Sequence, residues 1–229
     1  MLFDLRGRGS RRTVQAIYLS LAILLGGGLV LFGIGSDQSG GLVDALSGEN
    51  GGGSATDSLD KQIDAQLAKT RADPKDAAAW AQLAVVRFRR AGITGQQGGV
   101  YSDDGKRRLG LAAAAWERHL ALERKQPNVR AANLMVQAYG AQGLNELDKA
   151  VGAKQIVTSA ERPPSSNLYA QLAVLAYQAG DNRTGDLASN RAVDLAPKAD
   201  RKELRSTLDI LKQQAAAESA RQATTTPAG

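Results

Sequence analysis

The sequence predicts an all-α protein with three parts: an N-terminal membrane-spanning helix, a flexible linker and a domain of repeated helix pairs. Three observations support this prediction. An uncharged apolar stretch follows a cluster of arginines near the N-terminus, and a nine-residue apolar pattern recurs three times further along the chain. No convincing run of alternating apolar and polar residues indicates a strand anywhere after the linker.

The membrane-spanning helix is predicted at residues 13–35, directly after the basic segment 1–12. No charged residue occurs from Thr13 to Ser36, and as a helix Val14–Ile34 would span roughly 32 Å, close to a hydrocarbon core of about 30 Å. The arginines predict a cytoplasmic N-terminus and an extracytoplasmic remainder. A cleaved signal peptide is the alternative, favoured by two glycines shortly before Ser36, but the apolar stretch is long for one.

Residues 36–56 are rich in Gly and Ser and predict a flexible linker. Helical periodicity follows, because Leu59, Ile63 and Leu67 recur every four residues. The parts expected after the linker are a repeat domain at 57–222, with an end helix at 57–72 and another at 200–220, and a disordered polar tail at 223–229.

The strongest signal is the internal repeat, whose copies begin at Trp80, Ala131 and Tyr169. All three have Ala at the second position, Leu at the fourth, Val at the sixth and an aromatic residue at the ninth. One helix pair cannot bury its own apolar stripe, so such pairs are expected to stack in a row. The aromatic residues are Phe88, Tyr139 and Tyr177.

The third copy resembles the tetratricopeptide repeat (TPR) family. It departs from the family pattern at Gly185 and Ser189, where the family prefers Ala and an aromatic residue. The resemblance implies an α-solenoid of about three helix pairs with capping helices, and an irregular helical bundle is the alternative because the first two copies are longer than the family repeat. The matching residues are Tyr169, Leu172, Ala173, Tyr177, Gly180, Ala192 and Pro197.

An insertion at 93–109 lengthens the first copy, between its two helices. Its composition is polar and rich in Gly, which predicts a long loop. Such a loop either contacts a partner, through Tyr101 and the charged residues after it, or is a solvated hairpin-like excursion without a ligand.

Composition excludes several classes of enzyme and metal site. The chain has no Cys and one His, which excludes thiol nucleophiles, thiolate sites and centres with several histidines. His119 is expected to be a packing residue, and Asp103-Asp104-Gly105 lacks the ligand spacing of a calcium loop. We therefore expect no enzyme activity, no cofactor and no metal.

The net charge of +6 is unevenly distributed, because residues 37–60 carry five carboxylates and neither Lys nor Arg. The basic remainder favours an anionic partner such as an acidic client, lipid headgroups or a wall polymer, with a solvated basic face as the default. Nucleic acid is not expected, since Lys and Arg are spread along the helices without interleaved aromatic residues.

The TPR resemblance also implies a peptide-binding groove along the first helix of each pair. Packing between helices is the alternative role for its aromatic residues. The implied groove residues are Ala81, Val85, Phe88, Arg89, Ala132, Val136, Tyr139, Ala170, Val174, Tyr177 and Gln178.

The layout of anchor plus repeats resembles two bacterial groups: translocon-associated repeat proteins that accompany periplasmic chaperones, and repeat subunits of cytochrome c maturation. The first group is preferred. It implies a single-pass membrane protein whose extracytoplasmic TPR domain binds a protein or peptide, as a scaffold or chaperone-like assembly factor near the secretion machinery. A self-associating structural factor and a cell-envelope enzyme are the alternatives, but no catalytic motif supports the enzyme.

Overall fold

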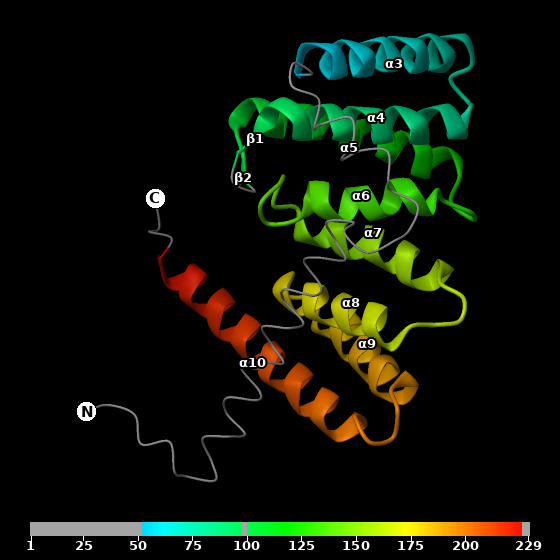
Figure 1. The fold of residues 1–229 in the computed structure, drawn as a ribbon. Coiled ribbons are helices and arrows are strands. Elements are labelled where there is room, and N and C mark those ends of the chain that lie inside the picture. Colours follow the sequence, from blue (N-terminus) through cyan, green and yellow to red (C-terminus); the bar gives the residue numbers. More distant parts are fainter. Residues whose placement is uncertain (1–51, 98–99, 226–229) are drawn as a thin grey trace.

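The computed structural model describes residues 52–97 and 100–225, and most of them are helical (Figure 1). This part of the chain forms eight helices and one short antiparallel ribbon, which confirms the all-α prediction for it. The ribbon joins β1 (Gln96–Gln97) to β2 (Val100–Tyr101). The helices are α3 (Gly52–Ala72), α4 (Ala77–Gly95), α5 (Asp103–Leu122), α6 (Val129–Tyr139), α7 (Leu147–Ala160), α8 (Ser166–Gln178), α9 (Asn182–Leu195) and α10 (Arg201–Thr225).

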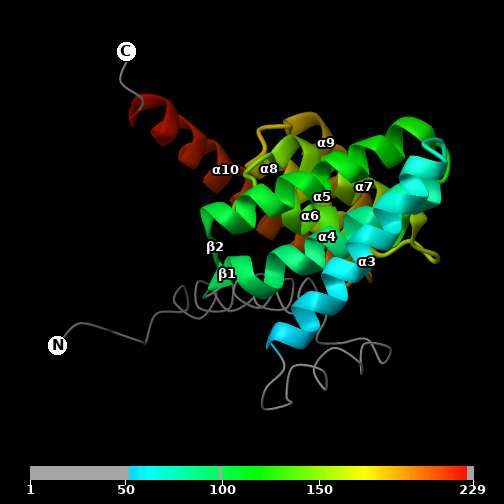
Figure 2. The ribbon, with the colours of Figure 1, turned by 90° about the horizontal axis from the view of Figure 1, so that it is seen from above.

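Three helix hairpins form a row between two end helices. α4 packs on α5, α6 on α7 and α8 on α9, while α3 covers α4 at one end and α10 covers α8 and α9 at the other. The first helix of each hairpin lies on the same side of the row, in front in Figure 1 and nearer the lower edge in Figure 2. We call α4, α6 and α8 the first-helix layer, and α5, α7 and α9 the second-helix layer.

Side-chain caps begin five of the described helices. The Asp76 carboxylate, for example, accepts a hydrogen bond from the Ala79 N–H in the first turn of α4. Such caps satisfy backbone N–H groups that have no partner within the helix, so they determine where the chain turns from one helix to the next. The capping residues are Asp76, Ser102, Asn128, Ser165 and Asp181.

Two apolar clusters fill the space between the layers. The first lies among α4, α5, α6 and α7 and includes Leu83 and Trp116, and the second lies among α7, α8, α9 and α10 and includes Leu172 and Leu208. The Leu at the fourth position of the repeat is therefore buried in the first and third copies. In the second copy it is Leu134, which is partly buried against the first cluster.

The segment 93–109 is not the long loop that its composition predicts. α4 continues to Gly95, the ribbon reverses the chain, and α5 begins at Asp103. A Cβ atom on Gly95 would overlap the Cα atom of Gly105, and the Ser102 N–H donates to the Gly95 carbonyl at 2.7 Å. The glycines thus allow two helix ends to meet, so a composition typical of loops here serves close packing.

Both ends of the helical part extend beyond the predicted limits. α3 begins at Gly52, so the last residues of the linker predicted at 36–56 are helical. α10 continues to Thr225, into the tail predicted at 223–229. The basic segment and the membrane helix predicted within residues 1–35 lie outside the described residues, and no described helix is long and apolar enough to cross a membrane.

Candidate functional site

Most of the side chains expected to line a groove are buried between helices. Phe88, Tyr139 and Tyr177, the aromatic residues of the repeat, are 9%, 1% and 4% exposed. Their rings belong to the two apolar clusters, which is the packing role left open by the sequence. Arg89, Val174 and Gln178 reach the surface. The buried members of the set are Ala81, Val85, Phe88, Ala132, Val136, Tyr139, Ala170 and Tyr177.

Each helix of the first-helix layer has a row of exposed or partly exposed residues along one face. Its members are three, four or seven residues apart, so they lie on one face of their helix. We call these three faces the open stripes. They comprise Ala78, Gln82, Arg89 and Ile93 in α4, Arg130, Asn133 and Gln137 in α6, and Asn167, Gln171, Val174 and Gln178 in α8.

A carboxamide occupies the same repeat position in all three open stripes. Gln82, Asn133 and Gln171 are each the third residue of the nine-residue pattern, and each is exposed or partly exposed. A carboxamide can donate and accept hydrogen bonds, as a peptide backbone does. The apolar positions of the repeat do not reveal this position, although the same alignment of the three copies contains the signal.

Gln171 is held by a buried lysine. Lys154 of α7 is 2% exposed, and its Nζ donates to Gln171 Oε1 at 2.6 Å. Burial lowers the pKa of Lys154 to about 8, because removing an ammonium group from water disfavours its charged form. Thr158, one turn further along α7, is also buried, and its Oγ1 has no hydrogen-bond partner among the described residues.

Arginine is the only charged residue type in the first-helix layer. Arg90 forms an ion pair with Asp60 of α3 at 2.8 Å, and Arg87 donates to a backbone carbonyl of α5. The guanidinium group of Arg89 makes no hydrogen bond or ion pair within residues 52–97 and 100–225. Burial, and then the nearby charge of Arg130, lower the pKa of Arg89. Two like charges therefore lie close together on the open stripes of α4 and α6.

A cleft of about 320 Å³ lies between α5 and α7. Its charged side chains are already paired, because Lys149 Nζ lies 2.7 Å from Glu117 Oε1 and 2.8 Å from Glu146 Oε2. The Tyr139 hydroxyl also donates to Glu117, at 3.3 Å. The lining residues are Trp116, Glu117, Leu120, Tyr139, Lys149, Gly152, Ala153 and Ile156.

The same grouping recurs at the end of the row. The Tyr177 hydroxyl donates to Asp186 at 2.9 Å, Lys212 Nζ lies 2.7 Å from Asp186, and the lysine also lies over the tyrosine ring. Lys149 lies over the Tyr139 ring in the same way. Since both groups join neighbouring helices and satisfy their own charges, we interpret them as contacts that hold the row together.

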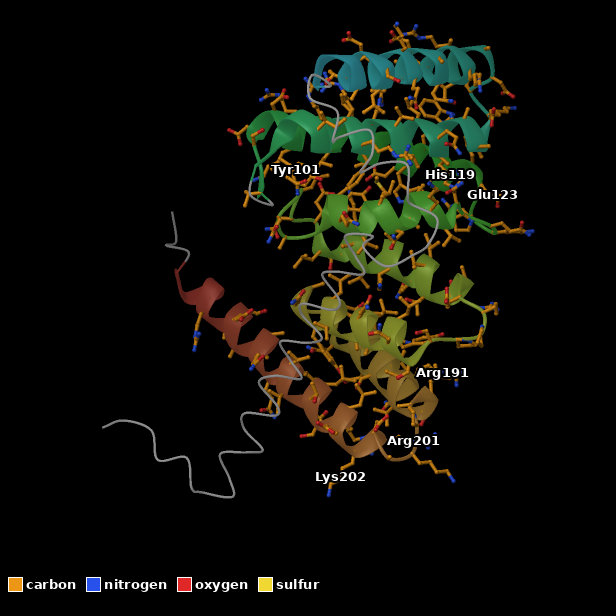
Figure 3. The ribbon with its side chains drawn as sticks, viewed as in Figure 1. Tyr101, His119, Glu123, Arg191, Arg201 and Lys202 are labelled. Atoms are coloured by element: carbon orange, nitrogen blue, oxygen red, sulfur yellow. The ribbon has the colours of Figure 1, made fainter. Side chains whose placement is uncertain are left out.

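His119 has a structural role at the end of α5. The Asn128 N–H donates to His119 Nε2 at 2.9 Å, so Nδ1 carries the proton and donates to the Ala77 carbonyl at 2.8 Å. The imidazole is 3% exposed and joins the start of α4 to the turn before α6. Figure 3 shows it near Glu123, far from Tyr101 at the other end of α5. Both ring nitrogens are used, as expected for a packing residue.

No group of His, Cys, Asp or Glu in the described ranges could hold a metal ion. The Asp103-Asp104-Gly105 sequence forms the first turn of α5, where Asp104 pairs with Arg107 and Arg108. These contacts stabilise the start of a helix.

The described residues form an all-α protein with three helix hairpins in a row, in which the first helices present amides and arginines to solvent. Comparison with protein-family models, with curated proteins and with solved structures gives no match.

Proposed function

We propose that the chain is a membrane-anchored interaction module of the TPR type, whose open stripes bind an extended segment of a partner polypeptide. The observation that carries this proposal is the carboxamide at one repeat position of three successive first helices, Gln82, Asn133 and Gln171. α4 and α6 contact each other directly, and packed helix axes lie roughly 8–10 Å apart, which is about three residues of an extended chain. The stripes of α4 and α6 thus contact the peptide backbone at points about three residues apart, and the stripe of α8, which packs on α7, contacts it further along.

The arrangement of the helices supports the TPR type. Three hairpins follow the three sequence copies, and an end helix covers each side of the row. The departure at Gly185 has a local reason, since a Cβ atom there would overlap the Tyr177 ring. A tyrosine at the ninth position of the repeat thus takes the space that the family's alanine would fill.

In this proposal residues 13–35 anchor the chain and the repeat domain is extracytoplasmic. The arginines of 1–12 and the uncharged stretch that follows support this orientation. The domain then acts as a scaffold or chaperone-like assembly factor near the secretion machinery. Binding is favoured over catalysis because His119 uses both ring nitrogens in backbone hydrogen bonds.

Site-specific photo-crosslinking in the native membrane tests the proposal. A benzophenone amino acid is introduced at Gln82 or Gln178 in the open stripes, or at Leu111 or Leu187, which are 53% and 65% exposed on the second-helix layer. We expect polypeptide adducts from the two stripe positions and none from the two controls. Adducts from the controls alone would place the binding surface on the second-helix layer and contradict the proposal.

A further inference from the structure

We infer that the segment bound by the open stripes is acidic, and that one of its carboxylates binds beside Gln171, in front of Lys154. The inference rests on the proposed function, because it names the chemistry of the peptide that the same surface binds. The occupant of the open stripes is thus an acidic segment of a partner polypeptide.

The charge of the first-helix layer is the first reason. α4, α6 and α8 contain four arginines and no Asp or Glu. Arg89 and Arg130 lie close enough for their charges to interact, and no carboxylate of the described residues pairs with either. A negative charge placed near them is attracted by both, so the layer favours an acidic segment over a neutral or basic one.

The orientation of the Gln171 amide is the second reason. A lysine ammonium group only donates, so Gln171 directs its oxygen at Lys154 and presents its NH₂ group to other partners. That group donates to Asn167 Oδ1 at 3.4 Å, a long hydrogen bond. The side-chain amides of Gln82 and Asn133 make no hydrogen bonds within the described ranges and can rotate. The third stripe therefore presents a donor, and it selects a ligand group that accepts.

The buried charge behind this donor is the third reason. Lys154 is 2% exposed, and within the described residues its one recorded partner is the neutral Gln171 amide. A buried cation without a counter-charge destabilises a protein, and a carboxylate bound at Gln171 would supply that charge. Lys149, in the cleft between α5 and α7, gains nothing comparable from a bound carboxylate, because Glu117 and Glu146 already neutralise its charge.

The test compares fluorescein-labelled peptides of Glu-Ala-Gly repeats and of Gln-Ala-Gly repeats, bound to the full chain in detergent micelles and measured by fluorescence anisotropy. Gln171→Glu places a carboxylate beside Lys154 and so imitates the ligand. Gln82→Glu is the matched control, because it makes the same change at the equivalent position of α4, where no buried lysine is bonded to the amide.

We expect the wild type to bind the Glu peptide about tenfold more tightly than the Gln peptide, which is the effect of one favourable charge contact. Gln171→Glu should weaken Glu-peptide binding about tenfold and raise the unfolding temperature by about 3 °C, because the new carboxylate pairs with Lys154. Gln82→Glu should not raise the unfolding temperature. Equal binding of both peptides, or no stabilisation by Gln171→Glu, would overturn the inference.

A second pair of variants separates this inference from the proposed function. Arg89→Gln with Arg130→Gln should weaken Glu-peptide binding about tenfold, and Arg183→Gln with Arg191→Gln, which removes two charges from α9, should not. If both peptides bind equally and the stripe substitutions weaken both, the acidic preference is wrong and the proposed function stands. If the stripe substitutions change the affinity for neither peptide, the proposed function fails as well.

The acidic residues of this chain before α3 are the competing occupant. Asp44→Asn with Glu49→Gln should leave the affinity for the Glu peptide unchanged if the site serves a partner. A tenfold gain in affinity for the Glu peptide would mean that the chain's own acidic segment occupies the site in the wild type. This result would contradict the inference that the site binds a partner.

Discussion

Replacing Lys154 by Met should make the protein more stable at neutral pH. Burial lowers the pKa of Lys154 from 10.5 to about 8, which corresponds to about 3 kcal/mol of unfavourable free energy at roughly 1.4 kcal/mol per pH unit. Met has a similar volume and no charge, while the lost hydrogen bond to Gln171 costs about 1 kcal/mol. The expected net gain is about 2 kcal/mol.

The gain should depend on pH in a defined direction. Folded Lys154 has a lower pKa than the unfolded lysine, so between about pH 8 and 10.5 the unfolded state binds more protons and the stability of the wild type rises with pH. The advantage of Lys154→Met is therefore greatest below about pH 8 and disappears toward pH 10.5. The pKa values of Tyr177 and Tyr139 are raised by burial, but both tyrosines are present in both proteins and cancel in the difference.

Urea unfolding followed by circular dichroism, at about pH 7.5 and about pH 10, measures this difference. Lys149→Met is the control on the same helix, because hydrogen bonds to Glu117 and Glu146 raise the pKa of Lys149. That variant should lose stability, and the loss should be nearly the same at about pH 7.5 and about pH 10, because both values lie below the unfolded and the raised folded pKa of Lys149. A Lys154→Met protein that is less stable than the wild type, or equally stabilised at both pH values, would refute the reasoning.

Three further substitutions should lower stability, each measured by urea unfolding against Leu187→Ala, which is 65% exposed and should cost less than about 0.5 kcal/mol. Leu172→Ala should cost about 2–5 kcal/mol because the side chain is 5% exposed in the second apolar cluster, and a cost near zero would place it on the surface. Gly185→Ala should cost about 1–3 kcal/mol because the added Cβ overlaps the Tyr177 ring, and an unchanged stability would show that the ring moves freely. His119→Ala should cost about 2–4 kcal/mol through two lost hydrogen bonds, and an unchanged midpoint would contradict the structural role of the imidazole.

The order of the helices could be predicted from the sequence because apolar residues repeat at helical spacing. Trp80, Ala131 and Tyr169 begin matched patterns, and each pattern lies in the first helix of a hairpin. The segment 93–109 was predicted wrongly because Gly is common both in loops and at close helix contacts. Only the three-dimensional approach of Gly95 to Gly105 distinguishes the two.

The candidate site was harder to predict. Val85 and Phe88 are three residues apart and do share a face of α4, but that face is buried against other helices. Spacing identifies which residues share a face and does not identify which neighbour covers it. The contact between Lys154 and Gln171 joins two different hairpins, so no pattern within either helix could reveal it. The amide position could have been found by extending the repeat comparison to polar residues.

Nuclear magnetic resonance of side-chain amides tests the central claim most directly, because the claim concerns Gln82, Asn133 and Gln171. The full chain, labelled with nitrogen-15 in Gln and Asn, is titrated with the Glu-Ala-Gly peptide in detergent micelles. The account predicts shifts in the carboxamide signals of these three residues, and none in Gln155 or Asn190, which are exposed on the second-helix layer. Shifts confined to Gln155 and Asn190, or no saturable shift in the three stripe amides, would contradict it.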